Sequence, residues 1–183
     1  MDNKKREVAT TGVDGSNNLH PVMQYGLRVS EAIACLRKGG FKYASIVLLY
    51  SAIDSMAWAD SDKEVVGNQG FKNWVSKYML GPNQALLPEV TAEDLWGARC
   101  GVLHTSAPES NSFRDKKARR LFYRSNVGEI SAPDQTVIVV SLENLGWAFA
   151  SGLLYFLDDL QNDKSRDKGA REKLMRVLID QAV

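Results

Sequence analysis

The chain has 183 residues, 44% of them hydrophobic, and a formal net charge of +1, so it is long enough for one domain with a real core and lacks the overall charge typical of nucleic-acid-binding proteins. Its cysteines, Cys35 and Cys100, form no CxxC pair, which argues against a disulfide framework and a zinc site, so we expect a reduced, cytoplasmic chain that needs no metal or other cofactor. The apolar stretches are too short for a membrane span and the polar N-terminus has no signal peptide, so no membrane contact is expected.

The sequence of the first half of the chain predicts a polar segment followed by two long helices. Residues 1–20 are polar and without periodicity, so we expect a mobile N-terminal arm ahead of a single helical domain over residues 21–183. A helix is predicted from Pro21 to about Arg37. Its inward side chains are predicted to be Met23, Leu27, Ile33 and Leu36. Residues 41–60 are apolar on nearly every side, which is typical of a helix at the centre of a bundle, and Asp54 lies on its narrow polar stripe.

Two shorter helices are predicted next. Residues 71–80 follow an amphipathic pattern. The anchors of this helix are Phe71, Trp74, Val75, Tyr78 and Met79. The segment 91–104 also follows the helical repeat, and Thr91–Asp94 fits a capping box at its start. Arg99 falls within the apolar arc of this helix, where a charge is costly unless it is paired, so Asp54 is the natural candidate to neutralise it.

A basic segment separates these helices from the rest of the chain. Residues 112–127 interleave cations with aromatic side chains, a composition that can track a phosphate backbone while the rings stack on bases, or that can simply form a solvated surface. The cations are Arg114, Lys116, Lys117, Arg119, Arg120 and Arg124. Strand-like runs at 121–126 and 136–140 flank a turn, so we expect residues 112–140 to form an inserted β-hairpin.

The last part of the chain predicts two more helices. Ser141 is expected to cap a long helix that ends near Leu160. Its inward residues are predicted to be Leu142, Leu145, Phe149, Leu153, Phe156 and Leu160. Residues 162–169 are charged and are expected to end this helix, and a final helix is predicted over residues 170–182. The tryptophans are assigned to the core, namely Trp58, Trp74, Trp96 and Trp147. The fold class is therefore all-α, a helical bundle with a small inserted hairpin.

The run Arg99-Cys100-Gly101-Val102-Leu103-His104 resembles the R-x4-6-H signature of the HEPN superfamily, and it ends a helix that follows a long apolar helix. HEPN domains are small helical bundles, often dimeric, and many are metal-independent endoribonucleases of toxin–antitoxin, abortive-infection and CRISPR-associated systems. The resemblance covers residues 21–104 and the later long helix. It implies a HEPN-like bundle with catalytic Arg99 and His104, a toxin or phage-defence context, and a cognate antitoxin or partner protein.

These residue types fit RNA cleavage without a metal. The reaction needs a base for the 2′-hydroxyl, an acid for the leaving 5′-oxygen and a cation for the phosphorane. Arg99 suits the phosphate oxygens because it stays protonated, His104 suits proton transfer near neutral pH, and Asp54 would orient or neutralise Arg99. One such histidine per chain cannot be both acid and base, so this hypothesis predicts a homodimer with a composite site.

Helix geometry and two residue identities keep other hypotheses open. Five residues turn an α-helix by about 500°, so Arg99 and His104 would point about 140° apart unless the helix distorts near Gly101 or a second copy completes the site. Cys100 stands where active HEPN members often carry a polar residue, and Ser106 where members modified by a nucleotidyltransferase carry tyrosine. The alternative is a non-catalytic HEPN-like module that binds RNA, a nucleotide or a protein partner, and a third hypothesis is a structural adaptor.

Overall fold

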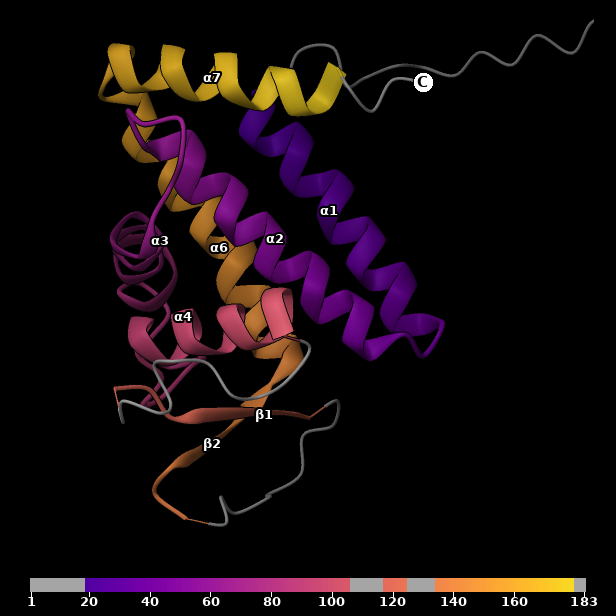
Figure 1. The fold of residues 1–183 in the computed structure, drawn as a ribbon. Coiled ribbons are helices and arrows are strands. Elements are labelled where there is room, and N and C mark those ends of the chain that lie inside the picture. The colour runs from indigo at the N-terminus through magenta and orange to yellow at the C-terminus, as the bar shows by residue number, and fades with distance from the viewer. Residues whose placement is uncertain (1–18, 106–116, 125–133, 180–183) are drawn as a thin grey trace, which may run out of the picture.

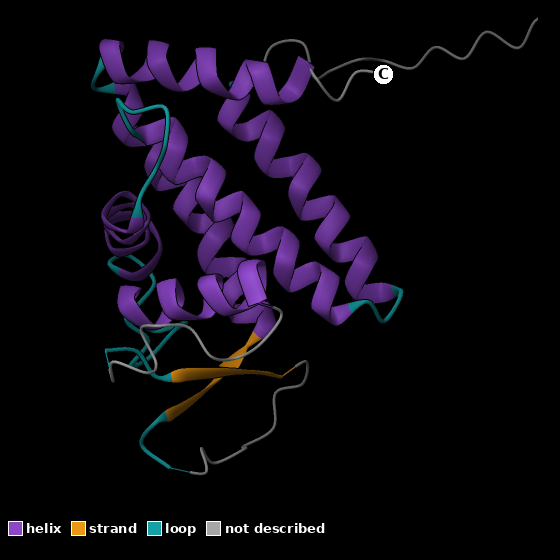
Figure 2. Ribbon diagram, in the orientation of Figure 1, coloured by secondary structure: helices purple, strands orange, loops and turns teal. Residues whose placement is uncertain are grey.

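The computed structural model describes residues 19–105, 117–124 and 134–179, and its helices form a bundle with a crossing helix at one end and a two-stranded sheet at the other (Figures 1 and 2). Helices α1 (Pro21–Lys38) and α2 (Lys42–Asp60) lie antiparallel, α6 (Leu142–Gln161) lies behind α2, and α7 (Lys164–Ile179) crosses the ends of these three. No helix within the described ranges is both long and apolar enough to cross a membrane.

Two further helices flank this bundle, and each changes from α to π geometry along its length. Helix α3 (Asn68–Trp74) continues as the π-helix η2 (Val75–Leu80), and α4 (Ala92–Cys100) continues as η3 (Gly101–Thr105). The predicted anchors of the first of these helices are all buried. A π-helix closes its hydrogen bonds five residues apart, so it is wider than an α-helix and turns less per residue.

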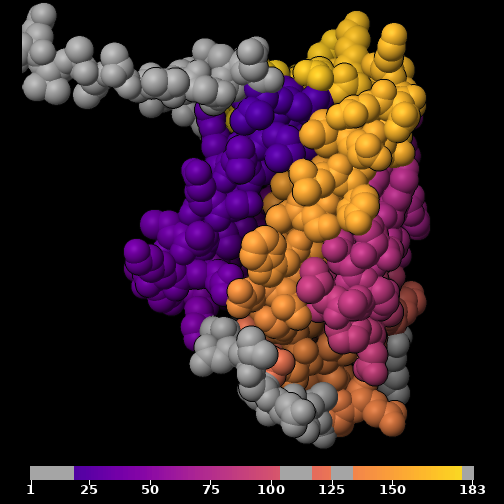
Figure 3. All heavy atoms as spheres, turned by 180° about the vertical axis from the view of Figure 1, so that it is seen from behind, coloured from indigo at the N-terminus to yellow at the C-terminus, as the bar shows by residue number. Residues whose placement is uncertain are grey.

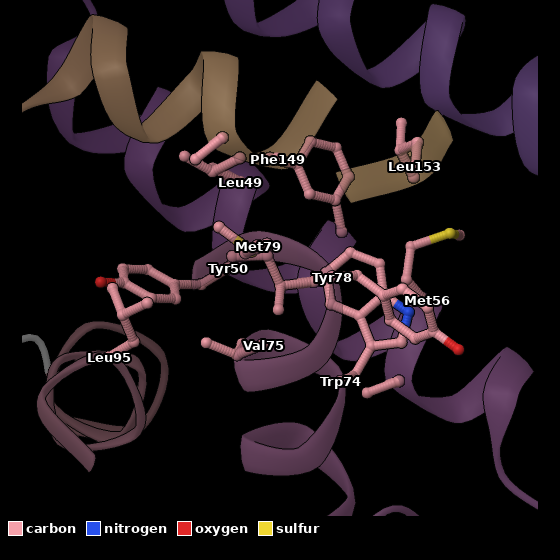
Figure 4. Packing of buried hydrophobic residues seen from close by; sticks show 14 of the residues in the cluster. Leu49, Tyr50, Met56, Trp74, Val75, Tyr78, Met79, Leu95, Phe149 and Leu153 are labelled. Atoms are coloured by element: carbon pink, nitrogen blue, oxygen red, sulfur yellow. The ribbon is translucent and has the colours of Figure 1, made fainter. Parts of the chain in front are cut away.

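The core confirms the central place of α2. Its Leu49, Tyr50 and Met56 are fully buried among side chains from α3, η2 and α6 (Figure 4). Trp74 stands at the middle of this cluster, with its ring centroid 5.6 Å from that of Tyr78 and 6.0 Å from that of Phe156. The predicted inward residues of α6 are likewise all buried, because they follow one face of a regular helix.

The predicted inward face of α1 is only partly correct. Ile33 packs against the core, but Leu27 is 47% exposed. The buried side chains are instead Val22, Tyr25 and Val29. Two contacts fix the rotation of the helix: the hydroxyl of Tyr25 donates to Ser55 Oγ of α2 at 3.0 Å, and Gly26 lies so close to α6 that a Cβ there would be 2.4 Å from Leu153 Cδ1. Because α1 carries apolar side chains on two sides, its own sequence does not determine which side is buried, and the contacts with α2 and α6 decide it.

The assignment of every tryptophan to the core is also wrong. Trp74 is buried and Trp58 and Trp96 are half-buried, but the side chain of Trp147 is 62% exposed. Trp147 belongs to the outer side of α6, which lies open between α1 and η2 when the molecule is viewed from behind (Figure 3). A long helix that covers a bundle from one side buries only one of its faces.

The predicted strands are present, but they do not form a hairpin. β1 (Arg120–Arg124) and β2 (Val137–Ser141) pair in parallel, with Arg120 opposite Val137 and Arg124 opposite Ser141. Parallel strands need a crossover of about a dozen residues or more, and residues 125–136 supply it. The direction of each strand is set by its attachment, because β1 starts at a contact with α4 and β2 runs directly into α6.

The final helix begins earlier than predicted. Asp163 caps it, since its Oδ1 accepts from the backbone N–H groups of Ser165 and Arg166, both at 3.1 Å. The buried Lys173 then reaches the end of α2. Its Nζ donates to the carbonyl oxygens of Trp58, Ser61 and Lys63 at 2.9, 2.5 and 3.0 Å. A cation at the C-terminus of a helix satisfies orphan carbonyls and favours the helix dipole.

His20, assigned to the mobile arm, is instead the N-cap of α1. Its Nδ1 accepts from the Val22 N–H at 3.1 Å, and its Nε2 lies 2.7 Å from Asp167 Oδ1. The remainder of the predicted arm, residues 1–18, lies outside the described residues. Burial lowers the pKa of His20 below its ordinary value of 6.5, and this outweighs the bond to Asp167, which raises it. The neutral ring is the form that can accept from Val22 and donate to Asp167 together.

Acidification should therefore weaken the fold through His20. A histidine whose folded pKa is depressed adds stability above its unfolded pKa of about 6.5, and this is lost as the pH falls toward the lower folded pKa. We expect the urea midpoint of the wild-type chain to fall between about pH 7 and pH 5.5 more steeply than that of His20→Asn, which keeps a capping side chain but cannot titrate. Parallel midpoint curves for the two proteins would contradict this assignment.

Candidate functional site

The predicted pairing of Arg99 with Asp54 is confirmed. Arg99 comes from the last turn of α4 and Asp54 from the polar stripe of α2. Nε and Nη2 of Arg99 both donate to Asp54 Oδ2, at 2.8 and 2.6 Å. The two side chains are 17% and 25% exposed, so the pair lies at the edge of the core rather than in bulk solvent. Two bonds to one carboxylate oxygen hold the plane of the guanidinium.

An aromatic ring and a thiol also lie beside Arg99. The guanidinium carbon lies 5.1 Å from the ring centroid of Trp96, within the range of a cation–π contact, and Trp96 packs against Phe71 with centroids 5.4 Å apart. Burial raises the pKa of the Cys100 thiol, and the positive charge of Arg99 offsets only part of this effect. Cys100 therefore stays protonated at neutral pH and is not an activated nucleophile.

Asp94 fixes the start of the same helix and joins it to the basic segment. The capping box is present: Thr91 Oγ1 accepts from the Asp94 N–H at 3.1 Å, and Asp94 Oδ2 accepts from the Thr91 N–H at 3.0 Å. Asp94 also accepts from the Arg119 N–H at 2.7 Å and from Arg119 Nη2 at 2.8 Å. Burial raises the pKa of Asp94, but the bonds from Arg119 and Thr91 outweigh it, so the net shift is downward. The carboxylate stays ionised.

The helix changes from α to π geometry at Gly101, and a distortion there is one of the two predicted ways to bring Arg99 and His104 together. Arg99 lies two residues before η3, and the backbone of His104 belongs to η3, while its side chain lies outside the described residues. Because η3 turns less per residue than an α-helix, positions 99 and 104 are separated by a smaller angle than the 140° or so of an ideal α-helix. The hydroxyl of Tyr43 donates to the carbonyl of Val102 within η3 at 3.1 Å, so α2 supports this turn.

An open cavity of about 370 Å³ lies beside the Arg99–Asp54 pair. It is lined by Asp54, Trp58, Glu64, Val65, Val66 and Arg99. Its charged side chains are two carboxylates and one guanidinium. Among the described residues, no group of three or more His, Cys, Asp or Glu side chains is arranged to hold a metal ion.

The cations predicted to bind RNA differ in their exposure and in their contacts. Arg114 and Lys116 lie outside the described residues, and Lys117 and Arg120 are exposed. The guanidinium of Arg119 contacts Asp94 and the carbonyl of Glu89, so its charge is already neutralised. Arg124 ends β1 and is half-buried. Sequence reasoning missed the link from Asp94 to Arg119, for which the only local signal was an aspartate in the capping box where glutamate or glutamine is preferred.

Comparisons with protein-family models, with characterised proteins and with solved structures found no match. The assignment of a function therefore depends on the residues of this chain and on their geometry. Three observations bear on it directly: the Arg99–Asp54 pair, the change of helix type after Arg99, and the charge of the adjoining cavity.

Proposed function

We propose that this chain is a metal-independent endoribonuclease of HEPN type that acts as a homodimer. The observation that carries the proposal is the local distortion of the motif helix. Arg99 is held in place at the end of α4, and the chain then widens into η3 before it reaches His104. A π-helical segment costs regular hydrogen bonding and occurs frequently at functional sites. Here it changes the angle that separates the two motif positions.

The proposed roles follow from the chemistry of each group. Arg99 binds the scissile phosphate and stabilises the charge that develops on its non-bridging oxygens. Asp54 is a positioning residue, because its carboxylate holds the Arg99 guanidinium through two bonds. His104 transfers a proton to or from the ribose oxygens. Because the neutral residue and its protonated form are both needed, the second histidine comes from the second copy.

The other histidine of the chain does not fill this place. His20 caps α1 and contacts Asp167 near the crossing helix α7, whereas η3 lies toward the opposite end of the bundle (Figure 1). A single chain therefore offers one histidine to the site around Arg99. In the proposed dimer, two copies of Arg99 and His104 share one cleft, and the exposed cations of the basic segment, Lys117 and Arg120, hold the RNA strand.

The charge of the cavity beside Arg99 favours a second candidate. With Asp54 and Glu64 against one guanidinium, this lining repels a phosphate rather than attracting it. The alternative is a non-catalytic HEPN-like module that binds RNA, a nucleotide or a protein partner. Of these three ligands, this observation favours the protein partner, because the other two carry phosphates. The context of either function, including a toxin or defence role and a cognate antitoxin, is carried only by the resemblance to HEPN proteins.

One assay separates the two candidates. Purified protein is incubated with mixed single-stranded RNA in EDTA, beside an Arg99→Ala/His104→Ala double variant, and the product ends are analysed. We expect cleavage by the wild-type protein alone and products that carry 2′,3′-cyclic phosphate. RNA binding without cleavage, by a wild-type protein that is dimeric in light scattering and folded in circular dichroism, would replace the nuclease by the binding module.

A further inference from the structure

The turn between α1 and α2 carries an unusual run of side chains. Residues 37–43, with the sequence RKGGFKY, alternate cations and aromatic rings and are here called the basic turn. Phe41 and Tyr43 are 64% and 50% exposed, although a phenylalanine in the core would stabilise the fold. Lys38 and Lys42 are exposed as well. The basic turn lies at the end of the bundle that carries the sheet (Figure 1) and projects beside it in the rear view (Figure 3).

The backbone of the basic turn presents Phe41 rather than leaving it loose. Gly40 has φ +82°, a left-handed conformation that lets the chain reverse between the helices. The ring of Phe41 rests on Gly39, since a Cβ there would lie 3.0 Å from Phe41 Cδ2 and 3.1 Å from Cε2. A side chain at position 39 would press on the ring, so the glycine allows this close contact. One side of the ring is therefore supported by backbone, while most of its surface remains in solvent.

The charge of the basic turn is of one sign. A surface hollow of about 340 Å³ is lined by Ala34, Arg37, Lys38, Lys42 and Leu142, with three cations and no carboxylate. These three cations take part in no ion pair recorded among the described residues. Arg37 and Lys38 suit the C-terminus of α1, but Lys42 stands in the first turn of α2, where the helix dipole disfavours a cation. Helix stability thus does not explain Lys42.

The basic turn adjoins η3, which continues the helix of Arg99, and the start of α6, which follows β2. Tyr43 donates its hydroxyl to the Val102 carbonyl in η3, two residues before His104. On the other side, Leu142 of the hollow follows Ser141, the residue opposite Arg124 in the parallel pair. Cations from α1 and α2 are therefore gathered at one end of the molecule, next to η3 and to the start of α6.

We propose that the basic turn binds single-stranded nucleic acid, with Arg37, Lys38 and Lys42 at successive phosphates and with Phe41 and Tyr43 as stacking surfaces for bases. A groove of cations interleaved with exposed aromatic rings is the pattern that recognises single strands without sequence preference. An acidic protein segment would satisfy the cations but would give the two rings no base to stack on. As the strand-holding surface of the site around Arg99, this assignment deepens the proposed ribonuclease function, but binding here does not require cleavage.

The test measures binding of a strand that cannot be cut. Binding is followed by fluorescence anisotropy with a labelled 2′-O-methyl oligouridine of roughly 20 nucleotides, which is longer than a single binding site. This oligonucleotide lacks the free 2′-hydroxyl that cleavage needs. The variants are Lys38→Glu/Lys42→Glu and Phe41→Ala. The matched control is Lys164→Glu/Lys168→Glu, which changes the net charge equally on exposed positions of α7, at the other end of the bundle. Circular dichroism checks that each protein is folded.

We expect Lys38→Glu/Lys42→Glu to weaken binding at least tenfold and to reduce the slope of log K against log salt by about 1.4, or 0.7 for each lost phosphate contact. Phe41→Ala should weaken binding about tenfold with the slope unchanged, because stacking releases no counterions. The control should bind within about twofold of the wild type. Equal losses in both charge variants, or no binding by the wild type at low salt, would overturn the assignment.

Two further results distinguish this inference from binding of an acidic protein segment and from the ribonuclease proposal. If an oligoglutamate peptide of similar charge binds as tightly as the oligouridine, and Phe41→Ala changes neither affinity, the basic turn takes an acidic protein segment and the inference is wrong. If the oligouridine binds as expected while cleavable RNA stays intact in EDTA, the inference stands and the ribonuclease proposal fails.

Discussion

Replacing His104 by alanine should lower RNA cleavage by about 10²- to 10⁴-fold, the range that general acid–base catalysis contributes. The proposed composite site leads to a second, sharper expectation. If both the acid and the base are His104, one from each copy, a mixed dimer has lost one of them and is inactive. When wild-type and His104→Ala chains are refolded together in equal amounts, the mixture should have about a quarter of the activity of an equal total amount of wild-type protein. Only about a quarter of the dimers then contain two copies of His104.

Independent sites in each chain would instead leave about half of the activity, and that result would exclude the composite site while leaving the nuclease in place. The matched control is His20→Asn, which removes the other histidine of the chain at the far end of the bundle. It should cleave like the wild-type protein. Full activity of His104→Ala would remove the proposed role altogether.

Replacing Asp94 by asparagine should lower the free energy of unfolding by about 3 kcal/mol, which corresponds to a fall in Tm of roughly 6–12 °C for a chain of this size. Asp94 is only 2% exposed and accepts four kinds of bond, from the N–H and the hydroxyl of Thr91 and from the N–H and the guanidinium of Arg119. An asparagine offers one acceptor oxygen and places an NH₂ group against donors. The Arg119 guanidinium also loses its counter-charge.

Thermal unfolding followed by circular dichroism measures this loss. Glu93→Gln is the matched control, because Glu93 is the adjacent acid in the first turn of α4 and its side chain is 27% exposed, whereas that of Asp94 is only 2% exposed. A carboxylate that water can reach leaves no fully buried charge unpaired when it is neutralised, so the control should lose less than half as much. Similar losses in the two variants would show that the bonds from Arg119 contribute little.

Much of the helical framework followed from the sequence because it depends on local patterns. The capping box at Thr91, the cap at Ser141 and the buried face of α6 were each readable within a few residues. The Arg99–Asp54 pair was also predictable, since a charge in an apolar arc needs a partner and α2 has a single narrow polar stripe. What the sequence did not reveal depends on contacts between distant segments.

The rotation of α1 illustrates this limit. It is set by Ser55 and Leu153, which belong to two other helices, and nothing within α1 indicates their positions. The direction of β1 depends on its contact with Asp94, and a hairpin and a crossover give similar local patterns. The sequence does not distinguish the basic turn, for a different reason: residues 37–40 fit a helix stop and Phe41 fits an apolar helix, so only the three-dimensional structure shows that Phe41 is exposed.

The parallel pairing of β1 with β2 has a consequence for the order in which the chain folds. Two strands alone are marginally stable in water, and here they meet only after residues 125–136 have closed a loop between them. Their supports, the start of α4 and the start of α6, must already be in place. We therefore expect the strands to form after these two helix ends, and we expect their backbone amides to exchange with solvent deuterium faster than those of α2.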